Sequence, residues 1–407
     1  MSATRNRFLP TLGVARRFVA AVDVDHVHVA GMAVRRTCSP AYRWNAACWR
    51  LLDHNVRMTH SVTQPWIRTK DECQEMMALW PDVAHDLMEG AIEMRPEVHK
   101  WMAEVLQYNV PGGKKTRGLT VTYAYKLLAS NNQLTENNIR LTRILGLCIG
   151  MLQAYSLLLD EVPDRLLLRK YLPEWWNSNG FGAQAYDCGM LRLSFNHVII
   201  EHFKENECFY DLIELFEEML WETIRYQWSV SKFINFDKKL NLNSFTMLEY
   251  DSIVQYKTSN FSFLLPVITA MHFAGVNNVD KLRQAEGILL DMGHLFQVQD
   301  DYLAIFGNID KDSSDIEEGK CTWLVVEALQ QATPEQRKIL KECYNSSDPE
   351  KVRRVKQLFI DLGLPNTYSI YEEERYNLLN KEIQKISRGP LHSFFLDLLG
   401  KLYRRVV

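Results

Sequence analysis

Residues 157–165 read LLLDEVPDR, an apolar run that ends in closely spaced acids. If the run is helical, Asp160 and Asp164 stack on one face, because side chains four residues apart are neighbours on a helix. Two carboxylates on one face suit Mg²⁺, which usually takes one or two carboxylates together with phosphate oxygens of a substrate. The basic residues just downstream, Arg169 and Lys170, suit the phosphate itself. Taken alone, the stretch is also compatible with an ordinary solvated acidic helix end.

A second stretch of the chain repeats this design. Residues 296–303 read FQVQDDYL, again an apolar run that ends in adjacent carboxylates, here Asp300 and Asp301. Two plain solvated helix ends in one chain are a weaker explanation than a shared site. We therefore predict a metal site that is closed from two sides, with one diphosphate bridging its ions.

The composition bounds the class of protein. The chain has 407 residues, of which 47% are hydrophobic, and a formal net charge of −3. Its length predicts about two or three domains, and its nearly neutral charge argues against a nucleic-acid binder. No apolar run reaches the roughly 18 to 20 residues that a membrane-spanning helix needs. The cysteines form no CxxC pair or zinc-type spacing, so we interpret them as reduced thiols of an intracellular protein: Cys38, Cys48, Cys73, Cys148, Cys188, Cys208, Cys321 and Cys343.

The beginning of the chain differs from the rest. Arginines are frequent and acids are scarce up to about residue 50, and apolar side chains alternate with the first arginines. This composition is typical of a mitochondrial transit peptide, although serine is scarce. A disordered tail or a start codon placed too early explains it equally well. We predict an N-terminal extension over residues 1–65 and a cytoplasmic or mitochondrial protein.

Residues 66–407 are predicted to form a single all-helical domain. Apolar residues recur at the i, i+3, i+4 spacing of helices, and strand-like alternation is nearly absent. The main periodic segments are 119–128, 139–159, 212–230, 261–273, 282–306 and 323–329. These features favour one large helical bundle that carries its site inside.

Three further segments offer cations. Residues 111–118 read PGGKKTRG, in which two glycines let the backbone approach an anion and three cations follow. The GxxxxGK[ST] spacing of a Walker loop is missing. Lys257 with Thr258, and separately Lys320, add two cations and a hydroxyl. The alternatives are an ordinary basic helix start and solvated lysines.

Together these motifs resemble those of the trans-isoprenyl diphosphate synthases, most closely the farnesyl diphosphate synthases of animals, insects in particular. The resemblance spans nearly all of residues 70–407 and rests on separated motifs in that family's order: GGKKTRG (112–118), LQAYSLLLDEVPD (152–164), RK (169–170), YKT (256–258), FQVQDDYL (296–303) and KCTWLVVEAL (320–329). It implies an all-α isoprenoid synthase-type bundle with a central active-site cavity, usually as a homodimer. It also implies a prenyl diphosphate substrate and Mg²⁺ as the cofactor, with three ions and with Mn²⁺ as an alternative metal.

The resemblance carries residue roles to this chain. The metal ligands would be Asp160, Asp164, Asp300 and Asp301, and the catalytic set would be Asp160, Asp164, Lys257, Thr258, Gln297 and Asp300. The allylic diphosphate would be bound by Arg169, Lys257 and Lys320, and isopentenyl diphosphate by Lys114, Arg117, Gln153 and Lys170. The hydrocarbon pocket would be shaped by Tyr155, Ser156, Tyr226, Trp228, Val230 and Phe296.

Departures from that family's pattern concentrate at the chemistry. Glu161 replaces an aspartate and keeps its charge, whereas Ala304 and Val230 stand where the family has aspartates. One carboxylate about 4 Å from a cation is worth on the order of 4 kcal/mol at an effective dielectric constant of about 20. Tyr226 and Trp228 flank Val230, and aromatic faces stabilise cations by about 1–2 kcal/mol each. We therefore expect a terpene synthase, a carbon–oxygen lyase that ionises farnesyl diphosphate and releases a sesquiterpene.

Two other functions stay open. The intact residues for a second substrate, Lys114 and Arg117 among them, favour a diverged condensing enzyme that makes farnesyl or geranyl diphosphate. A catalytically weak paralogue that acts as a regulatory or heterodimer partner is the third. The retained carboxylates of Asp160, Asp164 and Asp300 argue against that third function.

Overall fold

The computed structural model describes residues 70–89, 95–161, 181–231, 241–307 and 314–403. The chain separates into two units, residues 1–60 and 61–407, and every described residue belongs to the second. The predicted N-terminal extension and its targeting role lie outside the described residues. They stay predictions, as does a domain boundary near residue 65.

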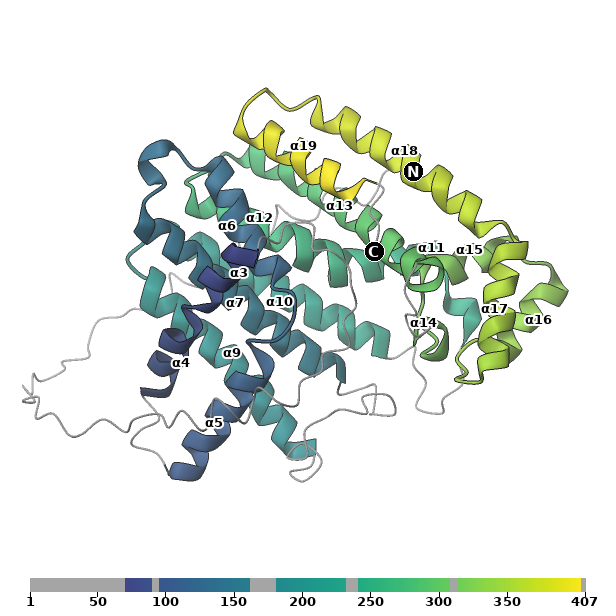
Figure 1. Ribbon diagram of the computed structural model, residues 1–407, viewed down its shortest axis with the longest axis horizontal. Helices are drawn as coiled ribbons and strands as arrows, with labels where there is room; N and C mark the ends of the chain where they lie inside the picture. Colours follow the sequence, from purple (N-terminus) through teal and green to yellow (C-terminus); the bar gives the residue numbers. More distant parts are fainter. Residues whose placement is uncertain (1–69, 90–94, 162–180, 232–240, 308–313, 404–407) are drawn as a thin grey trace, which may run out of the picture. The chain divides into compact units, whose positions relative to one another are not determined.

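Helices make up all the regular structure of the described residues, and no strand occurs among them. The prediction of an all-α fold is therefore confirmed. In chain order (Figure 1) the helices are α3 (Lys70–Met77), α4 (Trp80–Glu89), α5 (Pro96–Asn109), α6 (Thr116–Leu128), α7 (Glu136–Glu161), α9 (Phe181–Phe203), α10 (Phe209–Ser231), α11 (Met247–Ile253), the π-helix η3 (Val254–Leu264), α12 (Leu265–Phe273), α13 (Val279–Phe306), α14 (Ser314–Glu317), α15 (Trp323–Gln331), α16 (Pro334–Cys343), α17 (Pro349–Asp361), α18 (Leu364–Ile383) and α19 (Pro390–Leu402).

α7 carries the first acidic stretch at its C-terminal end. The helix is 26 residues long and packs against α6, α9 and α12. It approaches α6 closely because two glycines face each other: a Cβ on Gly118 or on Gly146 would lie 2.7 Å from the carbonyl oxygen of the other. Next to this crossing, Thr142 Oγ1 bonds to Thr122 Oγ1 at 3.1 Å. The α6–α7 contact therefore fixes the basic loop before α6 relative to α7.

α13 carries the second acidic stretch near its C-terminal end. It is 28 residues long, and the side chain of Asn278 caps its start by accepting a hydrogen bond from the backbone N–H of Lys281. Along one side it packs against η3. A Cβ on Gly293 would lie only 2.5 Å from Cα of Ser259, so the two backbones touch at this point. The contact brings the π-helix against the part of α13 that leads to Asp300.

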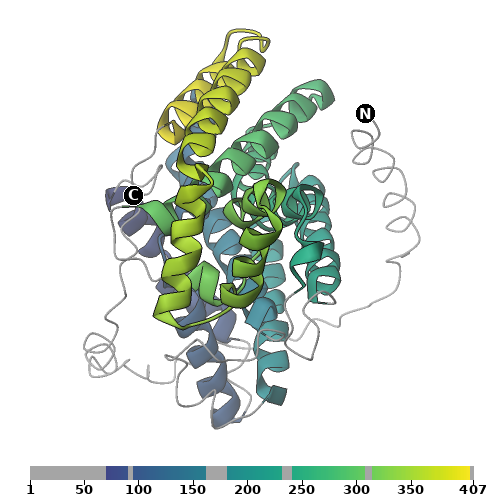
Figure 2. The same ribbon diagram turned by 90° about the vertical axis from the view of Figure 1, so that its right-hand side faces the viewer.

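The two C-terminal α-helices cover another side of α13. α18 and α19 form a hairpin that runs along α13 in both views (Figures 1 and 2). The buried Gln299 joins all three helices, because its Nε2 donates at 2.8 Å both to Glu372 Oε1 and to the carbonyl oxygen of Leu402. Tyr302 stacks on Tyr368 with ring centroids 3.7 Å apart. α18 is thus fixed beside the second acidic stretch.

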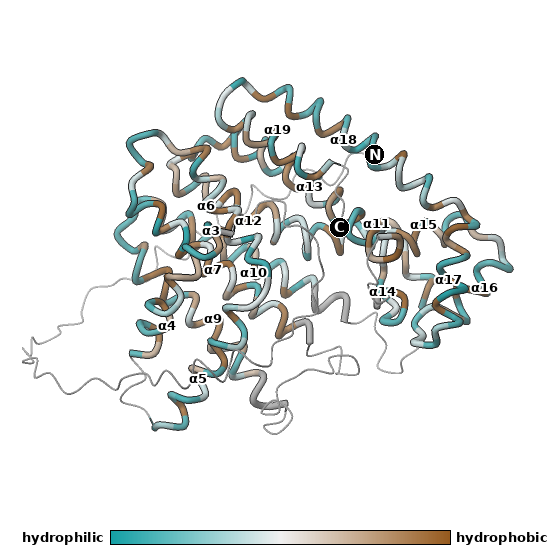
Figure 3. The backbone as a smooth tube through the Cα atoms, viewed as in Figure 1, coloured by the Kyte–Doolittle hydropathy of each residue, from teal (hydrophilic) through white to brown (hydrophobic). Residues whose placement is uncertain are grey.

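A hydrophobic cluster lies where α15, α16 and α17 meet. Trp323, Val325, Val355 and Phe359 are buried in it. The outer turns of α16 and α17 are polar, as the teal segments of Figure 3 show. This cluster anchors Trp323, the first residue of α15, directly after the loop that carries Lys320.

Two predictions from composition concern the chain as a whole. The six cysteines among the described residues form no disulfide. One stretch of α7, Glu136–Leu159, is long and apolar enough by length and composition to cross a membrane, so sequence inspection underestimated its apolar length. Because 67% of its most apolar window is buried within the bundle, core packing accounts for this composition.

Candidate active site

The first acidic stretch stands at the edge of the described residues. The backbone of α7 is described to Glu161, and that of α10 to Ser231. Several predicted site residues have no described side chain, either because the whole residue or because its side chain lies outside the described part: Asp160, Asp164, Arg169, Lys170, Trp228 and Val230. Their roles stay predictions.

The last turns of α7 carry three predicted site residues whose side chains are described. Gln153, Tyr155 and Ser156 are all half-buried. Burial raises the pKa of the Tyr155 hydroxyl, and the nearby thiol of Cys188 adds to the shift. Tyr155 therefore lies toward α9. The Ser156 hydroxyl is buried and has no hydrogen-bond partner among the described residues.

The contact between η3 and α13 assembles three of the predicted residues. Thr258 Oγ1 donates to Gln297 Oε1 at 2.6 Å, and Gln297 Nε2 donates to Asp301 Oδ1 at 2.8 Å. Thr258 is buried, whereas the neighbouring Lys257 is exposed. Short π-helical segments are frequent at functional sites, because the widened turn re-aims side chains. Here the π-helix presents a hydroxyl to α13 and a cation to solvent.

Asp301 is engaged by the protein on both oxygens. Besides the bond from Gln297, its Oδ2 accepts from the Tyr250 hydroxyl at 2.8 Å and from the backbone N–H of Trp323 at 2.9 Å. Burial raises the pKa of this carboxyl to about 7, although its three donors oppose the shift. A carboxylate offers about four lone pairs, and three of those of Asp301 are occupied. The adjacent Asp300 is half-buried, and its role as a metal ligand stays a prediction.

The basic loop meets the second acidic stretch through Arg117. Its Nε donates to Ser262 Oγ of η3 at 2.9 Å, and its guanidinium lies 6.0 Å from the centre of the Phe261 ring. Burial lowers the pKa of Arg117 to about 10, and the charge of Asp300 opposes this shift. η3 also bonds to α13 through Thr258 and Gln297, so it connects the start of α6 with the second acidic stretch. Lys114 lies in the same loop and is half-buried.

Lys320 is held in an ion-pair cluster before α15. Its Nζ lies 2.9 Å from Asp315 Oδ1 and 2.7 Å from Glu318 Oε2. Burial opposes its charge, but the two carboxylates outweigh burial and raise its pKa. The side chain is 49% exposed, so water screens these pairs and a multiply charged anion can compete for the ammonium.

Aromatic side chains line the faces of α10, η3 and α13. Tyr226 stacks on Tyr256 with ring centroids 5.3 Å apart, and Phe296 packs on Phe263 at 5.4 Å. Burial raises the pKa of the Tyr226 hydroxyl, and the charge of Glu249 adds to the shift. Two of the residues predicted to shape a hydrocarbon pocket thus belong to an apolar layer next to the polar site.

Comparison with known proteins assigns this arrangement to a family. The family model described as polyprenyl synthetase matches residues 99–362, which contain every predicted site residue. The chain belongs to the polyprenyl synthetase family. This polyprenyl synthetase is 43% identical over 349 residues to the farnesyl pyrophosphate synthases of Murgantia histrionica and Nezara viridula. Both alignments cover 84% of this chain. They cover 84% of the Murgantia protein and 85% of the Nezara protein.

More distant relatives are also similar to this chain, one in sequence and one in structure. The farnesyl pyrophosphate synthase of Gallus gallus is 37% identical, over 82% of this chain and 92% of that protein. The crystal structure of T. brucei farnesyl diphosphate synthase is similar with a TM-score of 0.74 and 25% identity, over 82% of this chain and 99% of that one. The predicted resemblance and bundle are therefore confirmed.

The expectation of a terpene synthase, a lyase, is wrong. The relatives are named farnesyl diphosphate synthases, which are prenyltransferases. The prediction gave more weight to the two missing carboxylates than to the residues that the resemblance predicts for a second diphosphate. Arg117 is half-buried and its Nε bonds to Ser262 of η3. The resemblance predicts that this cation binds a second diphosphate, which favours a condensing enzyme.

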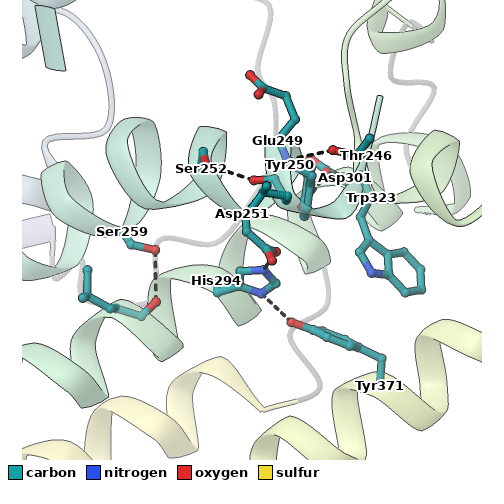
Figure 4. Close-up of polar contacts among 12 residues, drawn as sticks. Thr246, Glu249, Tyr250, Asp251, Ser252, Ser259, His294, Asp301, Trp323 and Tyr371 are labelled. Carbon is teal, nitrogen blue, oxygen red and sulfur yellow. Dashed lines mark hydrogen bonds and ion pairs between the residues drawn. The ribbon is translucent and has the colours of Figure 1, made fainter. Parts of the chain in front are cut away.

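Sequence reasoning missed several side chains of this polyprenyl synthetase site. Tyr250 bonds to Asp301 from α11, and His294 bonds to Asp251 and Tyr371 (Figure 4). None of these residues belongs to a motif of closely spaced charges. The only signal for His294 is that a titratable side chain interrupts the apolar run that precedes FQVQDDYL.

Proposed function

We propose that this polyprenyl synthetase condenses isopentenyl diphosphate with an allylic diphosphate, which yields geranyl or farnesyl diphosphate and releases diphosphate. In this reaction the C–O bond of the allylic substrate breaks, a C–C bond forms and one proton is lost. The observation that carries the proposal is the hydrogen bond from Arg117 Nε to Ser262 Oγ of η3, the same element that bonds to α13 through Thr258 and Gln297. It supports two diphosphate-binding regions that adjoin each other, as a condensation needs.

The two diphosphates would be bound by different cations. For the allylic diphosphate we propose Lys257, Lys320 and Arg169. The screened ion pairs of Lys320 support this, since its ammonium is accessible to an anion. For isopentenyl diphosphate we propose Lys114, Arg117, Gln153 and Lys170. Arginine suits a phosphate because its planar fork donates two parallel hydrogen bonds.

Members of this family use Mg²⁺. Among the described residues no group of three or more His, Cys, Asp or Glu side chains could hold a metal by itself. The donor chemistry nevertheless fits Mg²⁺, which needs only one or two carboxylates when substrate phosphates supply other oxygens. We propose Asp160 and Asp164 on one side and Asp300 on the other, with three ions and with Mn²⁺ as a substitute. When bound, Mg²⁺ neutralises the charge of the leaving diphosphate.

The apolar layer would then receive the hydrocarbon tail. We propose that its length is limited by side chains at the ends of α7 and α10 and on α13: Tyr155, Ser156, Tyr226, Trp228, Val230 and Phe296. The stacked ring of Tyr226 supports this role, since a buried aromatic fills volume that a tail would otherwise occupy. Thr258 and Gln297 would orient the reacting end of the allylic substrate through their mutual hydrogen bond.

The test supplies the full-length chain with Mg²⁺, dimethylallyl diphosphate and isopentenyl diphosphate. We expect geranyl or farnesyl diphosphate together with stoichiometric diphosphate release, measured by chromatography of the dephosphorylated products. Omission of isopentenyl diphosphate should abolish product. Diphosphate release that is equally fast without isopentenyl diphosphate would contradict the proposal, and so would the complete absence of turnover.

We also propose that the protein is a homodimer joined through α9 and α10. The two helices contact each other through the rings of Phe195 and Phe216, 4.9 Å apart, and through an ion pair of Arg192 with Glu217. Both present exposed apolar side chains at helical spacing: Tyr186, Leu193 and Ile200 on α9, and Tyr210, Trp221 and Ile224 on α10. Exposed apolar surface of this kind marks interaction sites.

Light scattering coupled to size-exclusion chromatography tests the dimer. Leu193→Glu with Trp221→Glu should halve the mass, because these side chains are 68% and 63% exposed and a charge there costs the monomer little. Leu248→Glu, at an equally exposed leucine of α11 (77%), is the matched control and should leave the mass unchanged. A wild-type monomer, or a dimer that survives both α9–α10 substitutions, would contradict this interface.

A further inference from the structure

His294 joins three helices through one imidazole ring. On α13, its Nε2 lies 2.9 Å from Asp251 Oδ1 of α11, and its Nδ1 lies 2.7 Å from the Tyr371 hydroxyl of α18 (Figure 4). A carboxylate only accepts, so Nε2 carries hydrogen and donates to Asp251; in the neutral ring, Nδ1 then accepts from Tyr371. The side chain of His294 is 17% exposed. The neutral ring therefore donates at one nitrogen and accepts at the other.

The bond from His294 to Asp251 connects α13 to α11, the helix whose Tyr250 donates a hydrogen bond to Asp301. Asp251 follows Tyr250 in α11, and Tyr250 donates to Asp301 Oδ2 at 2.8 Å. His294 and Asp301 are seven residues apart on α13, which places them on one face two turns apart. α11 has seven residues and runs directly into η3, which packs on α13, so these two neighbouring bonds add to that packing in positioning α11.

The bond between His294 and Tyr371 links the same group of residues back to the carboxylate of Asp301 by a second route. The ring of Tyr371 lies 5.5 Å from that of Trp323, and the Trp323 backbone N–H donates to Asp301 Oδ2 at 2.9 Å. Contacts therefore run from Asp301 through α11 to His294, on to Tyr371, and back to Asp301 through α15. Figure 4 shows these side chains converging from separate elements.

A hydrogen-bonded Tyr, His and Asp could also activate the tyrosine as a nucleophile. Burial raises the pKa of the Tyr371 hydroxyl, and the neighbouring Arg375, 5.5 Å from the ring centre, only partly opposes this. A hydroxyl that is harder to ionise is a poor nucleophile. Moreover, Tyr371 packs against Trp323 and not against the aromatic layer of α10 and η3. The geometry is that of a support and not of a reacting group.

We propose that His294 is a positioning residue of the diphosphate site, which it orders through Asp251, Tyr250 and Asp301. Asp301 in turn holds Gln297, and Asp300 is its neighbour in the chain. Loss of the imidazole removes the bonds to Asp251 and Tyr371, so Tyr250, and with it the carboxylate of Asp301, loses part of the support that fixes its orientation. The identity of the ligand in this inference rests on the proposed function.

The test measures binding of inorganic diphosphate in the presence of Mg²⁺ by calorimetry, for the full-length wild type, His294→Phe, His294→Gln and Asp251→Asn. Outer-shell partners of a metal site typically contribute ten- to a hundredfold in affinity, so we expect His294→Phe to weaken binding on the order of tenfold. Asp251→Asn should weaken it in the same direction. His294→Gln keeps an amide donor toward Asp251 and should recover part of the affinity.

Coupling separates positioning from a loss of general stability. Because both residues act through one chain of contacts, the double variant of His294→Phe with Asp251→Asn should bind no more weakly than His294→Phe alone. In turnover, kcat should fall while KM for isopentenyl diphosphate stays within about twofold, because none of the cations proposed to bind it lies on α11, α13 or α18. The matched control is His272→Phe. His272 is a comparably buried histidine, 14% exposed and 4.0 Å from Asp211, at the far end of α12.

The outcomes distinguish the two proposals. If the wild type binds Mg²⁺–diphosphate and condenses its substrates while His294→Phe does both equally well, the positioning role is overturned. If His294→Phe unfolds, His294→Gln and Asp251→Asn still decide, because unchanged binding in both variants would overturn it as well. A wild type that binds diphosphate but condenses nothing would overturn the proposed function and leave the role of His294 measurable by calorimetry.

Discussion

Gly293→Ala should separate η3 from α13 at the point where their backbones touch. A Cβ at residue 293 would lie 2.5 Å from both Cα and Oγ of Ser259, whereas ordinary contact begins at 3.4 Å, so the two elements must move apart by about 0.9 Å. Overpacking of this kind costs about 1–3 kcal/mol. Since one contacting atom belongs to the backbone, a change of side-chain rotamer cannot relieve it.

The matched control lies on the same helix. Gly287 has no atom within 4 Å of an added Cβ, so Gly287→Ala gains only the helix propensity of alanine, about 1 kcal/mol of stabilisation. Gly293→Ala gains the same propensity and loses the contact. The difference in free energy of unfolding between the two variants therefore isolates the clash, and we expect it to be about 1–3 kcal/mol in favour of Gly287→Ala.

Catalysis should respond more strongly than stability. Thr258 precedes Ser259, and its bond to Gln297 measures 2.6 Å. A shift of about 0.9 Å would stretch this bond toward the limit of hydrogen bonding, and a misplacement of about 1 Å can cost on the order of a hundredfold in rate. Urea unfolding followed by circular dichroism, together with kcat, measures both effects. The reasoning is refuted if Gly293→Ala matches Gly287→Ala in stability and wild type in kcat.

Three other substitutions test separate parts of the site. Tyr250→Phe removes a buried donor to Asp301 and should lower the free energy of unfolding by about 2 kcal/mol, measured in urea. Arg117→Lys loses the planar fork and should raise KM for isopentenyl diphosphate on the order of tenfold in steady-state kinetics, with a smaller effect on KM for the allylic substrate. Burial, with Glu222 and other nearby carboxylates, raises the pKa of Glu218 to about 7. The folded state thus binds this proton more tightly than the unfolded state, and stability from this group falls as the pH rises from about 4.5 through 7. Glu218→Gln should flatten that part of the pH profile of stability in urea, and an unchanged profile would contradict the assignment.

Hydrophobic periodicity located the long helices well. The segments predicted at 139–159 and 282–306 correspond to α7 and α13, which begin at Glu136 and Val279. The predicted segment at 261–273 instead spans the end of η3 and all of α12. A π-helix changes the number of residues per turn for only a few turns, and residues 258–264 of η3 are all buried, so burial shows no period there. Periodicity therefore could not reveal it.

Spacing found the carboxylates but not their partners. Asp300 and Asp301 look equivalent in sequence, yet Asp301 is buried and accepts three hydrogen bonds from the protein, whereas Asp300 is half-buried. The partner Tyr250 lies 51 residues earlier in the chain, and the partner Trp323 lies 22 residues later. Contacts of this range depend on how α11 and α15 pack on α13, which no local pattern encodes.

The same distinction explains why the absent acids misled the functional prediction. Ala304 lies on α13 one turn after Asp300, so an aspartate there would add a second carboxylate on the side of Asp300. That inference treated every acid of a motif as a metal ligand. Asp301 belongs to the motif and is bonded within the protein, so charge and position in a motif do not by themselves assign a metal-binding role. Mg²⁺ commonly takes a single carboxylate from one side when phosphate oxygens complete its shell. A site with Asp300 in that role retains what condensation requires, and replacing Ala304 with aspartate should then change the affinity for Mg²⁺ more than the identity of the product.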